Sequence, residues 1–175
     1  VDSYLPTYFE IRATINAAKP LAGWKSNAYL IFDYVGPTDF KFAGVNISTD
    51  KIEMGHRTAA GWIVDVQTPA QVKPDQDYNL LLSINGLVAT LVVNNAQVFS
   101  FAFAPTIDIY GMAHGLNRGM VGLGANNSTA RIDNLAVQVL PPKITLQETE
   151  TFSDGVANRF TGFTSGIWEI AGSTY

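Results

Sequence analysis

The chain has 175 residues, the length of one domain, and only 15% of them are charged. The absence of cysteine excludes disulfides, thiolate metal ligands and cysteine nucleophiles, although it does not identify the compartment. With 47% hydrophobic residues, a net charge of −4 and no basic run, the composition predicts a compact globule and argues against nucleic acid as a partner.

Strand patterns dominate from one end of the chain to the other. Residues 9–15 give the clearest example, because their apolar side chains alternate with Glu10, Arg12 and Thr14. The expected strands follow one another at about 8–12 residues, the spacing of an all-β sandwich or barrel. They cover residues 9–15, 27–34, 40–48, 51–57, 62–67, 78–84, 87–93, 97–103, 120–125, 131–139 and 144–152.

Residues 78–107 form a run of 30 residues without a formal charge, long enough to suggest a membrane span. Turn residues divide this run, most clearly at Asn85-Gly86 and Asn94-Asn95, so we predict three strands and no membrane insertion. The Asn85-Gly86 pair predicts a type I′ hairpin turn, because that turn needs a positive φ at both central residues. The glycine-rich stretch 105–118 is the longest break and a candidate functional loop.

The composition changes at Pro141-Pro142. Residues 1–143 carry 10 basic and 11 acidic side chains, whereas residues 144–175 carry one and four. The last segment contains Phe152, Asp154-Gly155, Trp168 and Tyr175 in a pattern that reads as the opening of a β-sandwich module. We therefore expect a new structural segment to begin after the proline pair.

This tail resembles the opening of laminin-G-like, or concanavalin A-like, jelly-roll domains, which occur in large bacterial surface proteins and adhesins. Residues 8–15 and 25–34 resemble the body of such domains, and residues 121–124 and 131–137 resemble their closing strands. The resemblance implies an antiparallel β-sandwich of the jelly-roll type. It also implies a secreted or cell-surface module that serves in adhesion, in carbohydrate or other ligand binding, or as a spacer between neighbouring domains.

The order of the segments departs from this family pattern, because the expected opening follows the expected ending. The chain therefore looks circularly permuted or cut out of phase from an array of repeats. Our hypothesis is a single domain over residues 1–175, with 1–140 as its body and 144–175 as the segment that completes it. That segment would pack within its own chain or swap into a second copy.

Asp133 is the first candidate for a metal ligand. In an unbulged strand it is in phase with Leu135 and Val137, which would aim its carboxylate at the core, where a charge needs a partner. The resemblance implies a structural calcium ion bound by Asp133 with Asp154 and Gly155 of the opening segment, and calcium prefers such oxygen ligands. The alternatives are a β-bulge that turns Asp133 to water, or an ion pair with an arginine such as Arg131 or Arg159.

Carbohydrate binding requires aromatic platforms and planar polar groups on a sheet or its loops. Trp62 and Trp168 are in phase with aliphatic residues and are expected in the core, whereas Trp24 is expected in an exposed loop. Asp65 is expected on the sheet face opposite Trp62. The candidate ligand-binding residues are Trp24, Arg57, Asp65 and Tyr110.

The alternative function is that of a glycoside hydrolase or lyase. Glycoside hydrolysis requires two carboxylates that flank the scissile bond. Glu148 with Glu150, and Asp108, only approach the required motif, so a non-catalytic module is the preferred interpretation. His56 is expected to pack within a sheet, and the two histidines lack the spacing of a zinc or iron site.

Overall fold

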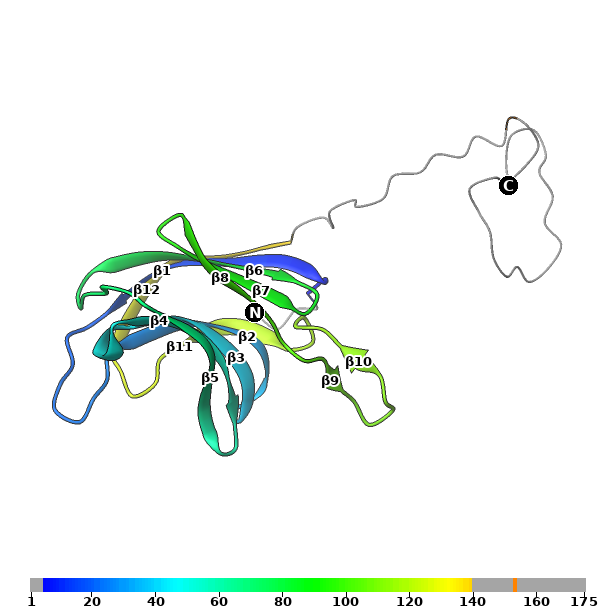
Figure 1. The fold of residues 1–175 in the computed structure, drawn as a ribbon, viewed down its shortest axis with the longest axis horizontal. Coiled ribbons are helices and arrows are strands. Elements are labelled where there is room, and N and C mark those ends of the chain that lie inside the picture. The colour runs from blue at the N-terminus through cyan, green and yellow to red at the C-terminus, as the bar shows by residue number, and fades with distance from the viewer. Residues whose placement is uncertain (1–4, 140–152, 154–175) are drawn as a thin grey trace. The chain divides into compact units, whose positions relative to one another are not determined.

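The computed structural model describes residues 5–139 and residue 153 (Figure 1). The chain divides into two compact units, Val1–Pro141 and Pro142–Tyr175. The predicted strand at 144–152 and the completing role of residues 144–175 lie outside the described residues, apart from Ser153, and stay predictions.

Two five-stranded antiparallel sheets stack face to face and form a β-sandwich (Figure 1). This confirms the predicted fold class, and a strand lies at each predicted position from 9–15 to 131–139. The first sheet has the order β12-β1-β6-β7-β8, with β1 (Tyr8–Ala17), β6 (Asp77–Asn85), β7 (Val88–Val93), β8 (Ala96–Ala102) and β12 (Ala130–Val139). The second has the order β11-β2-β3-β4-β5, with β2 (Asn27–Gly36), β3 (Asp39–Asn46), β4 (Lys51–Thr58), β5 (Gly61–Pro69) and β11 (Met120–Gly124).

Two small elements complete the described part of the chain. A single 3-10 turn, η1 (Ile47–Thr49), links β3 to β4, and the short strands β9 (Thr106–Ile107) and β10 (Ala113–His114) form a separate hairpin. This hairpin occupies the predicted functional loop and projects from one side of the sandwich (Figure 1). No helix in residues 5–139 is long and apolar enough to cross a membrane.

The core lies between the two sheets and is built from alternate residues of each strand. Phe9, Ile11 and Ile15 of β1 face Leu30 and Phe32 of β2 across the sandwich, and all five are fully buried. Alternation places every second residue of a strand on one face, so the period-2 pattern of the sequence translates directly into this core. The uncharged run contributes β6, β7 and β8, as predicted.

The β6–β7 hairpin turn differs from the prediction in type. In the β6–β7 turn, Asn85 pairs with Val88, so Gly86 and Leu87 are the central residues, and of the two only Gly86 has a positive φ, 62°. A positive φ at the first central residue alone is typical of a type II′ turn rather than the predicted type I′ turn. Asn94 and Asn95 between β7 and β8 both have positive φ, 49° and 66°, as a type I′ turn requires.

A bulge in β12 overturns the predicted orientation of Asp133. Thr14 pairs with Asp133 and Arg12 with Ala136, so residues 134 and 135 together oppose a single residue of β1. Such an extra residue reverses which side chains face the core, and Asp133 is exposed, with its Oδ1 accepting a 2.7 Å hydrogen bond from the Asn134 amide. The unbulged strand that aimed Asp133 inward was wrong, and the bulge alternative is correct.

A second bulge corrects the placement of Trp62. Met54 pairs with Val66 and Gly55 with Val64, which leaves Asp65 as the extra residue of β5. Val66 packs on the sandwich core, whereas Trp62 packs against residues on the opposite, outer face of the second sheet. Trp62 therefore does not belong to the core between the sheets, because the bulge breaks the alternation that linked it to Val66.

Candidate functional site

The outer face of the second sheet carries a layer of aromatic side chains. Trp62 is central to it, with ring centroids 4.8 Å from Phe42, 5.3 Å from Phe40 and 5.6 Å from Tyr29. Tyr34 extends the layer by stacking on Phe40 at 5.6 Å. We call these five residues the aromatic layer. Contacts at such distances stabilise each ring in a defined orientation, so the layer is a rigid surface.

A groove of about 300 Å³ runs beside the aromatic layer. Tyr34, Phe40 and Trp62 form one wall, and residues 120–125 of β11 and its continuation form the other. Gly122 leaves its part of the groove open, because a Cβ atom built there meets no atom within 4 Å. Trp62 and Tyr34 are half-buried and so present part of their rings to the groove. We call this feature the aromatic groove.

Arg57 supplies a charged group to the same face. Its Cα pairs with both Phe40 and Trp62, and cross-strand partners project their side chains to the same side of a sheet. The guanidinium donates a hydrogen bond to the carbonyl of Thr58, and the side chain is half-buried. Arg57, predicted as a ligand-binding residue, therefore lies among the aromatic rings.

A buried polar cluster lies further along this face. Glu53 is four residues before Arg57 in β4, about 13 Å away at the rise of a strand. The Tyr29 hydroxyl donates a 2.6 Å hydrogen bond to Glu53 Oε1, and Asn46 Nδ2 donates to the same oxygen at 3.1 Å. Burial, followed by the negative charge of Glu53, raises the pKa of Tyr29, which therefore remains protonated.

One buried polar atom in this cluster has no partner. Asn46 Oδ1 lacks a hydrogen bond within the described part of the chain. A buried acceptor without a partner is costly, and such atoms mark places where a bound group or an ordered water completes the hydrogen bonding. Between this cluster and Trp62, Gly55 is buried next to the Phe42 ring, whose Cζ lies 2.8 Å from the position that a Cβ atom would take.

The structure brings together only two of the four predicted ligand-binding residues, Arg57 and Asp65. Arg57 and Asp65 lie on the neighbouring strands β4 and β5, whereas Trp24 is exposed in the loop between β1 and β2, as predicted. Tyr110 is at the tip of the β9–β10 hairpin, with 84% of its surface exposed. None of the four lines the aromatic groove, whereas Arg57 and Asp65 both line a second cavity, between the two sheets.

Sequence reasoning missed Tyr34 and Phe40 of the aromatic layer and Glu53 and Asn46 of the polar cluster. The signal that could have found the layer is in β2, where Tyr29 and Ile31 alternate with Leu30 and Phe32. A strand that is apolar on both faces indicates that its outer face is covered as well. An exposed sheet in a sandwich would instead show polar residues at every second position.

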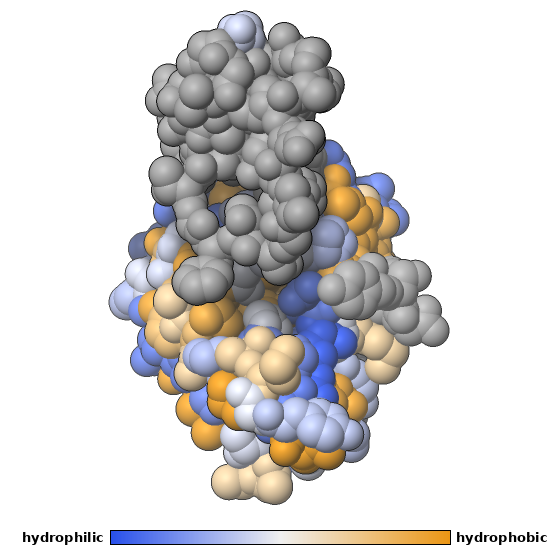
Figure 2. Space-filling view, turned by 90° about the vertical axis from the view of Figure 1, so that its right-hand side faces the viewer, coloured by the Kyte–Doolittle hydropathy of each residue, from blue (hydrophilic) through white to orange (hydrophobic). Residues whose placement is uncertain are grey.

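The β9–β10 hairpin is organised by Asp108. Asp108 Oδ1 accepts hydrogen bonds from the amides of Tyr110 and Met112, both at 2.9 Å, and Oδ2 lies 2.8 Å from His114 Nε2. These bonds hold Ile109 and Tyr110 at an exposed tip. Figure 2 views the side of the molecule from which the hairpin projects in Figure 1 and shows hydrophobic and hydrophilic residues interspersed there.

We expect the hairpin to loosen when Asp108 is protonated. The hydrogen bond from His114, followed by those from the backbone, lowers the pKa of Asp108 below 3.8. Because the pKa of Asp108 is lower in the folded than in the unfolded chain, the ionised carboxylate stabilises the fold at any pH above its unfolded pKa. This stabilisation is lost as the pH falls through the pKa of the folded chain. Amide chemical shifts of Tyr110 and Met112, followed by NMR from pH 6 to pH 2, should titrate below pH 3.8, and Asp108→Asn should abolish that titration.

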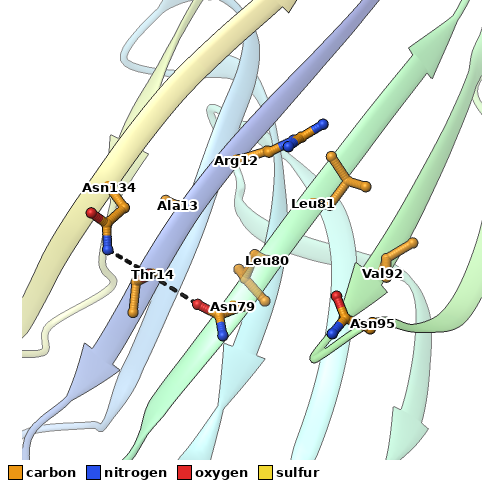
Figure 3. Close-up of a pocket in the computed structure, with 9 residues that line it drawn as sticks. All are labelled: Arg12, Ala13, Thr14, Asn79, Leu80, Leu81, Val92, Asn95 and Asn134. Atoms are coloured by element: carbon orange, nitrogen blue, oxygen red, sulfur yellow. Dashed lines mark hydrogen bonds between the residues drawn. The ribbon is translucent and has the colours of Figure 1, made fainter.

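The outer face of the first sheet has a different, polar concavity of about 510 Å³ (Figure 3). Asn134 Nδ2 donates to Thr14 Oγ1 at 3.1 Å, and Thr14 Oγ1 donates to Asn79 Oδ1 at 3.0 Å. Figure 3 shows this relay crossing from β12 over β1 to β6. Its lining residues include no aromatic ring, so this face lacks a platform of the kind present on the second sheet.

The calcium prediction is not tested by the structure. Asp133 is exposed and Asp154 and Gly155 lie outside the described residues. Within residues 5–139 and 153, no group of three histidine, aspartate or glutamate side chains is arranged to hold a metal ion. The described residues alone therefore do not form the site, and calcium binding by Asp133 stays a prediction.

Of the three carboxylates considered for the hydrolase alternative, the structure describes one, Asp108. Both carboxylate oxygens of Asp108 are hydrogen-bonded within the β9–β10 hairpin. Glu148 and Glu150 lie outside the described residues. His56 is hydrogen-bonded within the second sheet, with Nδ1 2.6 Å from Asp65 Oδ2, as the prediction of a packed histidine expects.

Comparison with solved structures finds β-sandwiches of similar fold. No protein-family model and no curated protein sequence matches the chain. The carbohydrate-binding module CBM66 from Bacillus subtilis is similar in structure, with a TM-score of 0.63 and 13% identity over 76% of each chain. For sheep galectin-11, solved in complex with glycerol, the TM-score is 0.53 and the sequence identity 14%, over 78% of this chain and 94% of the galectin. For the galectin LEC-6 of Caenorhabditis elegans, the TM-score is 0.52 and the sequence identity 12%, over 78% of this chain and 86% of the galectin.

At these identities the likeness concerns the fold alone. It confirms the antiparallel β-sandwich of the jelly-roll type, whereas the laminin-G-like subclass and the opening role of residues 144–175 stay predictions.

Proposed function

We propose that this protein is a carbohydrate-binding module and that the aromatic groove is its binding site. The observation that carries the proposal is the wall formed by Tyr34, Phe40 and Trp62, which borders the groove on the outer face of the second sheet. Sugar rings have apolar faces of C–H groups that pack on aromatic rings, while their hydroxyls need polar partners at the edges. The similar carbohydrate-binding module and galectins support this function because they share the fold.

Arg57 and the polar cluster suit the two ends of an oligosaccharide. The Arg57 guanidinium donates to hydroxyl oxygens beside the rings, and the unpartnered Asn46 Oδ1 accepts from a hydroxyl at the far end. The intervening distance of about 13 Å along β4 matches an extended ligand better than a single sugar ring. The ligand we propose is therefore an oligosaccharide that lies in the aromatic groove and extends over β3 toward β4.

We also propose an extracellular location, a role in adhesion and a structural calcium ion. These three proposals rest on the sequence resemblance to laminin-G-like domains. A module that binds a glycan on an exposed sheet fits a surface protein, and it needs no catalytic group. Self-association through residues 144–175 is likewise a proposal.

The binding proposal is tested on an array of neutral and charged oligosaccharides, followed by calorimetric titration of the strongest neutral hit. We expect Arg57→Gln to weaken binding about tenfold, because a hydrogen bond to a charged group contributes about 1.5–3 kcal/mol. Arg131→Gln is the matched control, since Arg131 is exposed on the first sheet, and its affinity should be unchanged.

Intrinsic fluorescence adds a direct readout of the groove. In a variant that combines Trp24→Phe with Trp168→Phe, Trp62 is the one remaining tryptophan, and the hit should change its emission. An array without any hit, or equal losses for Arg57→Gln and Arg131→Gln, would contradict the proposal.

A further inference from the structure

A second cavity, of about 660 Å³, opens between the two sheets and combines charged groups with aromatic walls. Lys41 of β3, His56 of β4 and Asp65 of β5 line one side, and residues 101–104 at the end of β8 line the other. We call it the mouth pocket. We propose that the mouth pocket is a separate binding site for a single neutral sugar ring.

The polar side of the pocket interrupts an otherwise apolar interior. Lys41 pairs with His56 across β3 and β4, so the two side chains leave the sheet on the same face. On that face the positions two residues further along are Ala43 and Met54, both fully buried in the core. Buried charged groups contribute little to stability compared with apolar side chains, so their presence at a cavity points to a role in binding.

Lys41 is held in place by a buried ion pair. Its Nζ lies 2.5 Å from Asp33 Oδ2, and the side chains of Lys41 and Asp33 are only 11% and 4% exposed. Asp33 Oδ1 in turn accepts a 3.1 Å hydrogen bond from the Gly119 amide. An ammonium has three N–H donors and this pair uses one, so Lys41 presents a fixed donor to the pocket.

Asp65 and His56 form a second fixed pair. His56 Nδ1 lies 2.6 Å from Asp65 Oδ2, and the bulge at Asp65 brings its carboxylate to this position. This bond occupies Nδ1 of His56 and Oδ2 of Asp65. Asp65 Oδ1 can then accept a hydrogen bond from a ligand, and His56 Nε2 can form a second hydrogen bond. Two adjacent hydroxyls of a sugar can therefore bond to this pair, one donating to Asp65 and one pairing with His56.

The opposite wall offers an apolar platform. Phe101 and Phe103 contact each other edge to face at 4.8 Å, and Lys41 Nζ is 5.7 Å from the Phe103 centroid. Phe103 is buried while Phe101 is half-buried. A ring with one C–H face and polar edges fits between this wall and the Lys41, His56 and Asp65 side.

The charges around the pocket select for a neutral ligand. Lys41 and Arg57 are positive, Asp39 and Asp65 are negative, and Asp33 lies behind Lys41. A carboxylate or an ammonium on the ligand would meet a like charge close to any partner of opposite sign. A neutral hydroxyl-bearing ring meets donors and acceptors without this penalty.

NMR titration of the intact chain tests the proposal. The probes are four neutral methyl glycosides, of glucose, galactose, mannose and fructose, together with glucuronate and glucosamine. At least one neutral glycoside should give saturable shifts of the His56, Phe101 and Phe103 ring signals. Asp65→Asn should weaken that binding about tenfold, while glucuronate and glucosamine should bind at least tenfold more weakly.

Control variants separate this site from the aromatic groove. Trp62→Phe should leave the mouth-pocket shifts unchanged, and Phe101→Leu should reduce them even if Asp65→Asn proves poorly folded. The proposal is overturned if no neutral glycoside gives saturable shifts up to its solubility limit, or if a charged probe binds more tightly. Weaker oligosaccharide binding in Trp62→Phe with intact mouth-pocket shifts would support both proposals, because Trp62 lines the aromatic groove and not the mouth pocket.

Discussion

Replacement of Gly44 by alanine is expected to lower the free energy of unfolding by about 3 kcal/mol. A Cβ atom at this position would lie 2.2 Å from the carbonyl oxygen of Ala28 and 2.9 Å from the Cα of Tyr29. Both are backbone atoms of the paired strand β2, so no side-chain rotation relieves the clash. Because β2 and β3 are central strands, the backbone shift would also disturb the aromatic layer.

Gly122→Ala provides the matched control for this substitution. Gly122 is a strand glycine of the same sheet, and an added Cβ meets nothing within 4 Å. We expect its free energy of unfolding, measured by urea denaturation, to change by less than about 1 kcal/mol. Equal effects of the two substitutions would show that the close approach of β2 and β3 does not require glycine.

Neutralising Asp33 is expected to destabilise the protein by about 3 kcal/mol, since Asp33→Asn leaves the buried Lys41 ammonium without its counter-charge. Asparagine retains the acceptor for the Gly119 amide and tolerates the positive φ of 46° at this position. The substitution therefore isolates the charge from the backbone geometry.

A double variant completes this experiment. Asp33→Asn combined with Lys41→Met removes both charges, and replacing a buried ion pair with an apolar side chain is often neutral. Urea denaturation should place the double variant within about 1 kcal/mol of the original chain. A double variant as unstable as the single one would contradict the view that the unpaired lysine causes the loss.

The strands could be predicted because each one buries a single face, or both faces, of a regular pleat. Residues 9–15 show this most clearly, and the structure extends the strand only to Tyr8–Ala17. The uncharged run was resolved into three strands from turn residues such as Asn94 and Asn95. Local patterns of this kind depend on neighbours within one or two strands, and the sequence contains them.

The positions of the bulges could not be predicted from the sequence. Beside each bulge, apolar residues stand at positions that could face the core whether or not the strand contains the extra residue. Val64 and Val66 have the same chemical character, yet Val64 is 41% exposed and Val66 packs on the core. The same ambiguity placed Asp133 inside when it lies outside. Only pairing with the neighbouring strand decides between the registers.

The candidate sites were predicted in part for the same reason. Arg57 and Asp65 were identified by residue type, but the mouth pocket that both of them line combines residues of β3, β4, β5 and β8, and the bulge at Asp65 sets the position of its carboxylate. The aromatic layer combines residues of β2, β3 and β5, which are distant in sequence. Its existence depends on the strand order of the sheet, and a linear pattern does not contain that order.

The bulges in β5 and β12 also have an evolutionary consequence. Each one is a single-residue insertion that the sheet retains at Asp65 and at residues 134–135. A relative that lost one of these residues would keep its strand but exchange the side chains that face water with those that face the interior. Related chains should therefore differ in length at these points only together with a reversal of polarity along the adjoining strand, and an alignment that ignores such gaps would compare inward-facing residues with outward-facing ones.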